Sequence, residues 1–141
     1  MNIQRLKKSV IMHEGVRYAK YKDHLGNFTI GVGHLIKPDE DFGTVDLTNE
    51  QVDKILNVDL NIAITDARHF ISENDTAEEA FEIVVEMAFQ LGLTRLLGFK
   101  NFRKSLQEQN YRESAAHMLD SRWAKQTPNR ANTLALQMEK I

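Results

Sequence analysis

The chain has 141 residues, of which 42% are hydrophobic and 27% charged, so it is long enough for one globular domain with its own core. The absence of cysteine excludes disulfides, thiolate metal sites and a thiol nucleophile. The net charge is −2, but the charges are distributed unevenly along the chain. Basic residues outnumber acidic ones at both ends, by seven to two in residues 1–37 and by nine to four in residues 95–141. In residues 38–94 there are two basic and fourteen acidic residues.

A short amphipathic helix is predicted at the N-terminus. Apolar residues recur at helical spacing from Ile3 to Ile11, and Gly15 follows as a plausible stop, so the helix should end near His13. No apolar run here is long enough for a signal peptide or a spanning helix, and we expect no stable membrane insertion.

Residues 16–32 predict a β-hairpin. β-forming residues lie on both sides of residues 23–27 (Asp-His-Leu-Gly-Asn), whose composition favours a turn. Asp23 is therefore expected near the turn. Gly31 and Gly33 in the second strand predict a bulge or a close backbone approach.

Two helices are predicted to begin at capping boxes. A Thr-x-x-Gln box at Thr48 opens a helix over residues 48–71, which would be about 36 Å long at about 1.5 Å per residue. A Thr-x-x-Glu box at Thr76 opens a second, strongly apolar helix that Gly92 should stop. We expect a solvated acidic face on this helix, formed by Glu78, Glu79, Glu82 and Glu86.

Shorter helices are expected around Thr94–Leu97, Phe99–Gln107 and Tyr111–Asp120. Thr127 and Pro128 place a cap and an N1 proline at the start of a last helix.

The predicted elements form an α+β fold in a single domain, residues 1–141. A small hairpin lobe covers residues 14–47, a linking helix residues 48–71, and a helical lobe residues 1–13 and 72–141. A groove between such lobes would be the natural site.

Two carboxyl groups in different environments suggest glycoside hydrolysis, which needs one protonated acid and one ionised carboxylate. Glu14 sits at a helix end, where the helix dipole and partial burial disfavour its charged form. Asp23 lies in a polar turn and should stay ionised. Thr29, on the return strand, could point its hydroxyl toward Asp23 and share a water with it. Without further context, a lone glutamate at a helix end and an aspartate in a turn usually have structural roles.

Separated blocks of sequence make the catalytic interpretation more specific. They comprise residues 13–17, 21–23 and 26–34, then residues 87–92, and finally residues 98–99 and 121–131. Together and in this order they resemble the phage lysozymes of glycoside hydrolase family 24, most closely the T-even phage type.

The resemblance implies a lysozyme-like fold and an endolysin that hydrolyses the β-1,4 bond between N-acetylmuramic acid and N-acetylglucosamine in peptidoglycan, with inversion. It implies Glu14 as the general acid, Asp23 as the second carboxylate and Thr29 as the residue that positions water. Arg130 matches an arginine that pairs with the catalytic glutamate.

Further positions are implied in the substrate groove and in a structural ion pair. The groove positions are Leu35, Phe89, Gln90, Phe102 and His117, of which the last two depart from the serine and asparagine frequent in the family. His34 and Asp59 match an ion pair between the hairpin lobe and the linking helix.

No cofactor and no metal are expected, because the other histidines lack paired ligand spacing. The basic ends of the chain favour an anionic partner, and no nucleic-acid module is recognisable. Five cations are candidates for a positive groove rim: Lys20, Lys22, Arg122, Lys125 and Arg130.

The resemblance also implies a monomer that accumulates in the host bacterial cytoplasm and reaches the periplasm and cell wall through a phage holin. Three alternatives remain open: a tail-associated lysozyme domain, a transglycosylase, and a non-catalytic wall-binding or phage tail structural module with the same fold. The presence of Glu14, Asp23 and Thr29 together argues against the non-catalytic module.

Overall fold

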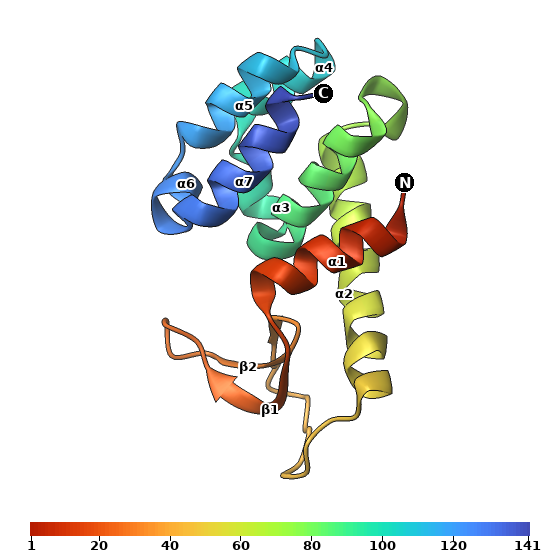
Figure 1. Cartoon of the computed structure of the whole chain (residues 1–141). Helices are drawn as coiled ribbons and strands as arrows, with labels where there is room; N and C mark the ends of the chain where they lie inside the picture. Colours follow the sequence, from red (N-terminus) through yellow and green to blue (C-terminus); the bar gives the residue numbers. More distant parts are fainter. The chain divides into compact units, whose positions relative to one another are not determined.

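The computed structural model describes residues 1–141 and contains seven α-helices, a short 3-10 helix and a three-stranded antiparallel sheet (Figure 1). The predicted α+β class is confirmed. The chain divides into two compact units: an N-terminal unit, Ile3–Asn61, and a C-terminal unit, Met1–Asn2 with Ile62–Ile141. The boundary falls inside α2 (Asn49–Phe70). This division groups the first helix with the hairpin, whereas the sequence placed residues 1–13 with the later helices.

In the N-terminal unit, α1 (Ile3–Glu14) leads into the hairpin. Its apolar stripe buries Leu6 and Val10. Gly15 ends the helix as predicted: its backbone adopts φ +73° and its N–H donates to the Ile11 carbonyl at 2.8 Å. This left-handed conformation favours glycine and turns the chain directly into the sheet.

The sheet has the order β1 (Arg17–Lys22), β2 (Phe28–Gly31) and β3 (His34–Leu35), all antiparallel. The hairpin and its turn were predicted, whereas β3 was not, because two residues carry no periodic signal. A close approach to the backbone occurs at Gly33, as predicted, whereas the bulge lies on the opposite strand, β1. Between the Arg17↔Gly31 and Tyr21↔Thr29 pairs, three residues of β1 lie opposite a single residue of β2.

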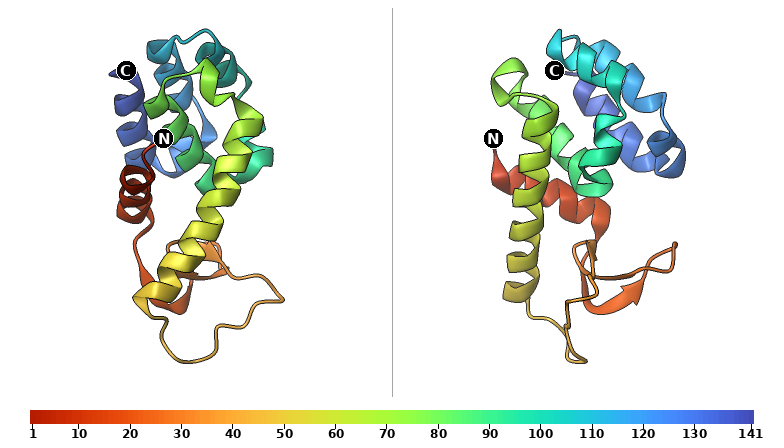
Figure 2. Two further views of the ribbon diagram at one scale, coloured as in Figure 1. Left: turned by 90° about the vertical axis from the view of Figure 1, so that its right-hand side faces the viewer. Right: turned by 180° about the vertical axis from the view of Figure 1, so that it is seen from behind.

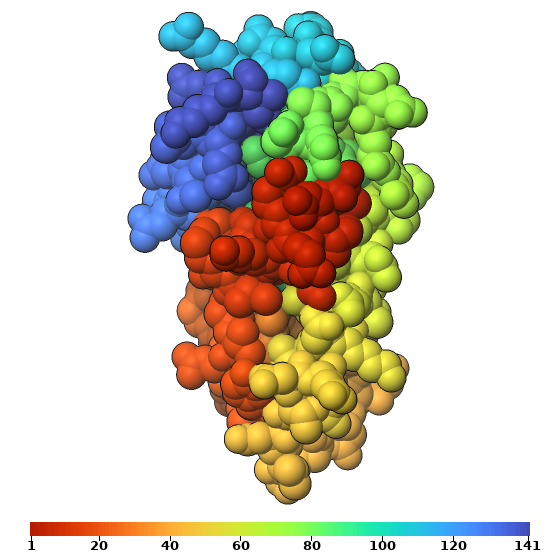
Figure 3. Space-filling view, turned by 45° about the vertical axis from the view of Figure 1, so that its right-hand side comes forward, coloured from red at the N-terminus to blue at the C-terminus, as the bar shows by residue number.

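A loop over residues 36–48 connects the sheet to α2. The Leu47 N–H donates to the Tyr18 carbonyl at 2.9 Å, and the Tyr18 hydroxyl donates to Asn49 at 2.7 Å. The end of the loop and the start of α2 are therefore both hydrogen-bonded to β1. The capping box at Thr48 forms as predicted, with reciprocal bonds to Gln51 of 2.8 and 3.1 Å. In Figure 3 the loop and the start of α2, in amber and yellow, lie at the surface beside the orange hairpin.

The C-terminal unit is helical. Its elements are the end of α2, the 3-10 helix Glu73–Asp75, α3 (Glu78–Leu97), α4 (Lys100–Gln107), α5 (Tyr111–Leu119), α6 (Arg122–Gln126) and α7 (Pro128–Glu139). Figure 2 shows α5 beside α4 and α7, and α7 also packs against α3 and α6. Buried aromatic rings, including Phe70, Phe81 and Trp123, fill this core. None of the helices combines the length and apolarity that a bilayer crossing requires.

The second capping box does not form. α3 begins at Glu78, and Ala77 before it makes no side-chain cap. The Thr76 hydroxyl instead donates to the phenol oxygen of Tyr111 at 3.4 Å, and the Ala77 N–H donates to the same oxygen at 2.8 Å. A distant tyrosine has thus taken over the capping function.

Gly92 ends the first helical stretch of α3, as predicted. Its backbone adopts φ 77° and ψ 166°, and a second helical stretch, which contains the helix expected at Thr94–Leu97, follows this kink as far as Leu97. The expected acidic face is only half correct. Residues 80–88 are all buried, which includes Glu82 at 6% and Glu86 at 2% exposure. A central helix that packs on every side has no solvated face at this level.

Candidate active site

The Glu14 carboxyl is held against the backbone of Gly33. Glu14 is the last residue of α1 and half-buried, while Gly33 lies between β2 and β3 with φ +64°. A Cβ atom at Gly33 would lie 2.5 Å from Oε2 of Glu14 and 2.9 Å from its Cδ. Glycine is required here twice, by the backbone conformation and by the close approach. At Gly31 a Cβ would meet nothing within 4 Å.

Asp23 organises the hairpin turn with one of its two carboxylate oxygens. Oδ1 accepts hydrogen bonds from the backbone N–H groups of Leu25 and Asn27, both at 2.9 Å. The Asp23 backbone N–H donates to the Asn27 carbonyl at 2.8 Å. Oδ2 takes no part in these bonds, so its lone pairs are available to water or to a ligand.

Thr29 is buried, at 6% exposure, in the middle of β2. Its hydroxyl donates across the hairpin to the Tyr21 carbonyl at 3.3 Å. The proton of this hydroxyl is therefore used within the sheet, and the expected sharing of a water with Asp23 stays a prediction. The oxygen of Thr29 retains lone pairs, which leaves it able to accept a hydrogen bond from water.

His34 bridges two carboxylates. Its Nδ1 lies 2.7 Å from Oδ2 of Asp59 on α2, the contact implied by the family resemblance. Its Nε2 lies 3.0 Å from both carboxylate oxygens of Glu40, in the 36–48 loop. The ring of Phe42 meets the imidazole edge-on at a centroid distance of 6.0 Å. No sequence pattern pointed to Glu40, which is one of several acids in a polar loop.

These contacts shift the pKa values of His34 and Glu40. Burial alone would lower the pKa of His34, but the hydrogen bonds and charges of Asp59 and Glu40 outweigh it and raise that pKa above 6.5. The pKa of Glu40 is held below 4.5, chiefly by the backbone N–H of Lys37 at 2.8 Å and then by His34.

The implied groove residues are distributed over both units. Leu35, in the N-terminal unit, is 54% exposed and available for contact. In the C-terminal unit Phe89 is half-buried, and the amide of Gln90 is fixed between two partners. Its oxygen accepts from the indole N–H of Trp123 at 2.8 Å, and its nitrogen donates to Thr127 at 3.3 Å.

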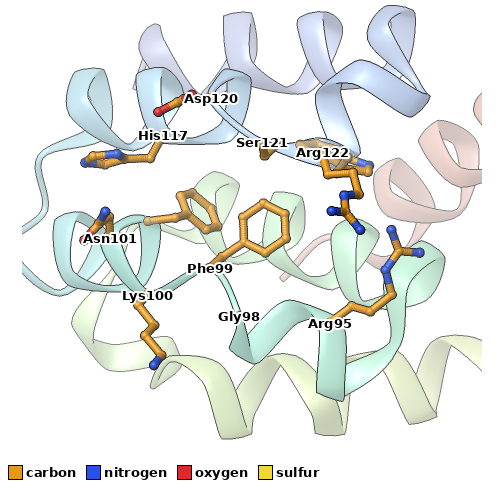
Figure 4. Close-up of a pocket in the computed structure, with 11 residues that line it drawn as sticks. Arg95, Gly98, Phe99, Lys100, Asn101, His117, Asp120, Ser121 and Arg122 are labelled. Atoms are coloured by element: carbon orange, nitrogen blue, oxygen red, sulfur yellow. The ribbon is translucent and has the colours of Figure 1, made fainter.

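A pocket of about 380 Å³ lies in the C-terminal unit (Figure 4). Its lining includes His117 and three cations, which are Arg95, Lys100 and Arg122. Phe102 is only 1% exposed and its ring stacks on Phe70 at 5.8 Å, so it supports the pocket and offers little surface to a ligand. His117 is held 3.3 Å from Glu113 one turn earlier on α5.

Arg130 is buried, at 8% exposure, which removes it from the expected rim of exposed cations. Its Nη2 lies 3.4 Å from Oε1 of Glu86 on α3. The pair explains how a carboxylate can be buried in the centre of the C-terminal unit. The implied pairing of Arg130 with Glu14 stays a prediction.

Comparison with known proteins agrees with this architecture. The family model for phage lysozyme matches residues 12–138. Probable T4-type lysozyme 1 of Dictyostelium discoideum is 28% identical over 165 residues, which cover 97% of this chain and 95% of that protein. Probable T4-type lysozyme 2 of the same organism is 25% identical over 154 residues, covering 92% and 91%.

A phage protein also matches over nearly the whole chain. The peptidoglycan hydrolase gp36 of Pseudomonas phage phiKMV is 26% identical over 133 residues, which cover 94% of this chain and 15% of that protein. The match of the family model extends over almost all of the sequence, including both parts of the hairpin and the last helix. The chain therefore belongs to the phage lysozyme family and is a glycoside hydrolase of the lysozyme type.

Proposed function

We propose that the chain hydrolyses the β-1,4 bond between N-acetylmuramic acid and N-acetylglucosamine in bacterial peptidoglycan, with Glu14 as the general acid. The observation that carries the proposal is the Glu14 carboxyl lodged against Gly33 at the end of α1. A side chain held in this way is presented to a ligand in a restricted position, which general acid catalysis requires.

The two carboxylates then take different parts in the reaction. Glu14 donates its proton to the glycosidic oxygen as the bond from that oxygen to the anomeric carbon breaks. A water molecule attacks the anomeric carbon from the opposite face and passes its proton to Asp23, through the oxygen Oδ2 that the turn does not use. The Thr29 oxygen accepts the second hydrogen of this water. Attack from the opposite face inverts the anomeric centre.

The groove residues serve to bind the glycan. In the N-terminal unit, Leu35 offers exposed apolar surface to a sugar ring. In the C-terminal unit, Phe89 and Gln90, both half-buried, are the positions that the family resemblance implies for glycan contact. The pocket beside His117 takes a further part of the substrate, and its three cations outnumber its single carboxylate, Asp120, which suits an anionic group.

The biological role that fits this chemistry is that of an endolysin. It acts as a monomer, is made in the host cytoplasm, and reaches the cell wall through a membrane lesion that a phage holin makes. Release of periplasmic markers from cells that produce the protein, with and without a holin, tests this part separately.

The activity itself is tested with purified sacculi. Glu14→Gln keeps the shape of the side chain but removes the acid, and release of reducing ends should fall by at least about 100-fold. Glu108→Gln, at an exposed glutamate, is the matched control and should retain parental activity. Normal activity of the Glu14 variant contradicts the assignment. Anhydro-sugar products would identify a transglycosylase instead.

A further inference from the structure

The edge strand β1 is exposed along its length. The side chains of Arg17, Lys20 and Lys22 are all exposed, and β1 has only β2 as a strand partner. An edge strand that carries cations on its surface is protected from pairing with another strand. These cations also sit in a specific arrangement.

Each of the three cations lies over an aromatic ring. Nζ of Lys20 and Nζ of Lys22 are 5.1 and 5.2 Å from the ring centre of Phe28, and the guanidinium carbon of Arg17 is 5.2 Å from that of Tyr21. Lys20 and Lys22 lie on one face of the strand, because both reach the ring of Phe28, which is the register partner of Lys22. The rings limit the freedom of the cations without neutralising them.

No carboxylate lies within ion-pair distance of these three side chains. Asp23 is the only acid in residues 16–36, a segment with three Lys and Arg residues. One oxygen of Asp23 is already used by the turn. The hairpin therefore presents an unneutralised positive surface, and its ammonium and guanidinium groups keep N–H donors for an outside anion.

We propose that this surface, Arg17, Lys20 and Lys22 with Phe28 and Tyr21, docks the carboxylate-bearing peptides of peptidoglycan. The inference rests on the proposed function, because those peptides hang from the same glycan strand that the enzyme would cleave. β1 runs directly into Asp23, so a peptide held along β1 brings its glycan toward the second carboxylate. Several weak contacts to a polymer with many carboxylates add up to useful retention.

An anionic membrane fits the hairpin less well. Insertion into a bilayer needs an apolar tip, and the turn offers only Leu25, which is 74% exposed. Its neighbours Asp23, His24 and Asn27 are polar. The rings of Tyr21 and Phe28 are covered by cations and are not presented at the tip.

The test measures binding without cleavage. In a Glu14→Gln background, Lys20→Gln with Lys22→Gln is compared with Lys8→Gln and Lys54→Gln, which removes two exposed cations elsewhere in the same unit. Binding to sacculi is followed by co-sedimentation at low salt. A second set of sacculi has its carboxylates converted to methylamides, so that charge is removed while the glycan is unchanged.

The hairpin variant should bind untreated sacculi roughly three- to ten-fold more weakly than its background, and the control pair should change binding by less than about two-fold. On amidated sacculi the two variants should bind alike. The difference should shrink as ionic strength rises beyond about 0.1 M, where charges are screened over about 10 Å. Lys20→Arg with Lys22→Arg should restore binding.

Several outcomes overturn the inference. Equal losses in both pairs indicate a net-charge effect, and an undiminished difference on amidated sacculi excludes carboxylates as the partner. Tighter binding to vesicles rich in phosphatidylglycerol than to sacculi assigns the surface to a membrane. Failure of the proposed function is seen separately, as the absence of reducing ends when the unmutated protein is incubated with sacculi.

Discussion

The carboxyl of Glu14 and the backbone of Gly33 occupy adjoining space, so that a single added carbon at Gly33 would come within 2.5 Å of the carboxylate oxygen. The collision would fall on the end of a flexible side chain. A side-chain carboxyl moves more easily than backbone, so Glu14 would leave its position to relieve the contact. A substitution at Gly33 should therefore affect catalytic activity more than it affects the stability of the fold.

Gly33→Ala should lower activity far more than Gly31→Ala. Both glycines have positive φ, +64° and +66°, so each substitution should cost about 1–2 kcal/mol of unfolding free energy for the left-handed backbone. Only the alanine at residue 33 displaces Glu14, and a displacement of about 1 Å can reduce kcat about 100-fold. Thermal melts and sacculus hydrolysis on both variants decide this. Equal activities would show that the contact does not position the acid.

Asp23→Asn should separate the two uses of this carboxyl. The amide oxygen of asparagine can still accept from Leu25 and Asn27, so unfolding free energy should change by less than about 0.5 kcal/mol. Asp23→Ala removes the acceptor and should cost about 1 kcal/mol. Both variants lose the proton acceptor and should cleave sacculi about 100-fold more slowly. An active asparagine variant would restrict Asp23 to the turn.

The His34 bridge should make stability depend on pH. The pKa of His34 is raised, so its contribution is present below 6.5 and lost as pH rises through the higher folded value. The pKa of Glu40 is lowered, so its contribution is present above 4.5 and lost as pH falls through the lower folded value. Both contribute fully between these limits. A neutral imidazole also has one N–H, and it can donate to only one of its two carboxylates.

Glu40→Gln should therefore lower the melting temperature most in mildly acidic buffer, with a smaller loss above the folded pKa of His34. Asp39→Asn, at an exposed neighbour in the same loop, is the control and should show no such window. Melts by circular dichroism across this pH range give the answer. A loss that is uniform with pH would mean that Glu40 acts through the Lys37 backbone alone.

Removal of one member of the buried Glu86–Arg130 pair should lower the unfolding free energy strongly, whereas replacement of both by apolar residues should lower it much less. Glu86→Ala leaves the guanidinium of Arg130 buried without this carboxylate and should lower the unfolding free energy by about 3–5 kcal/mol. Glu86→Leu combined with Arg130→Met removes both charges and should cost clearly less than the two single changes summed. Urea unfolding of the parent, Glu86→Leu, Arg130→Met and the double variant measures the coupling. Additive effects would show that the two side chains do not stabilise each other.

The two capping boxes show how far sequence alone can predict this fold. Thr48 and Thr76 precede the same local pattern, and only Thr48 forms the reciprocal bonds. At Thr76 the deciding group is the hydroxyl of Tyr111, which lies 35 positions away and is brought near by the packing of α5. Local patterns predict local bonds until a tertiary partner competes for the same atoms.

The residues of the candidate site also differ in whether neighbouring sequence or a distant partner identifies them. Glu14 and Asp23 were found because a helix end and a turn can be recognised from neighbouring residues, and the family motif strengthened both. Glu40 was missed because its partner His34 is reached through a loop with no periodicity. Glu86 was placed in solvent because charge alone cannot indicate that α3 is central and that Arg130 meets it.

The divided hydrogen bonding of Asp23 limits how this protein can change over evolutionary time. Catalytic residues are commonly poor for stability, so they are among the first positions to drift once activity is no longer selected. Glu14 is of that kind, since its carboxyl is not required by the turn. An oxygen acceptor at residue 23 stabilises the hairpin turn by about 1 kcal/mol, whether or not the enzyme works. An inactive descendant should therefore lose the glutamate early and still retain aspartate or asparagine at the turn.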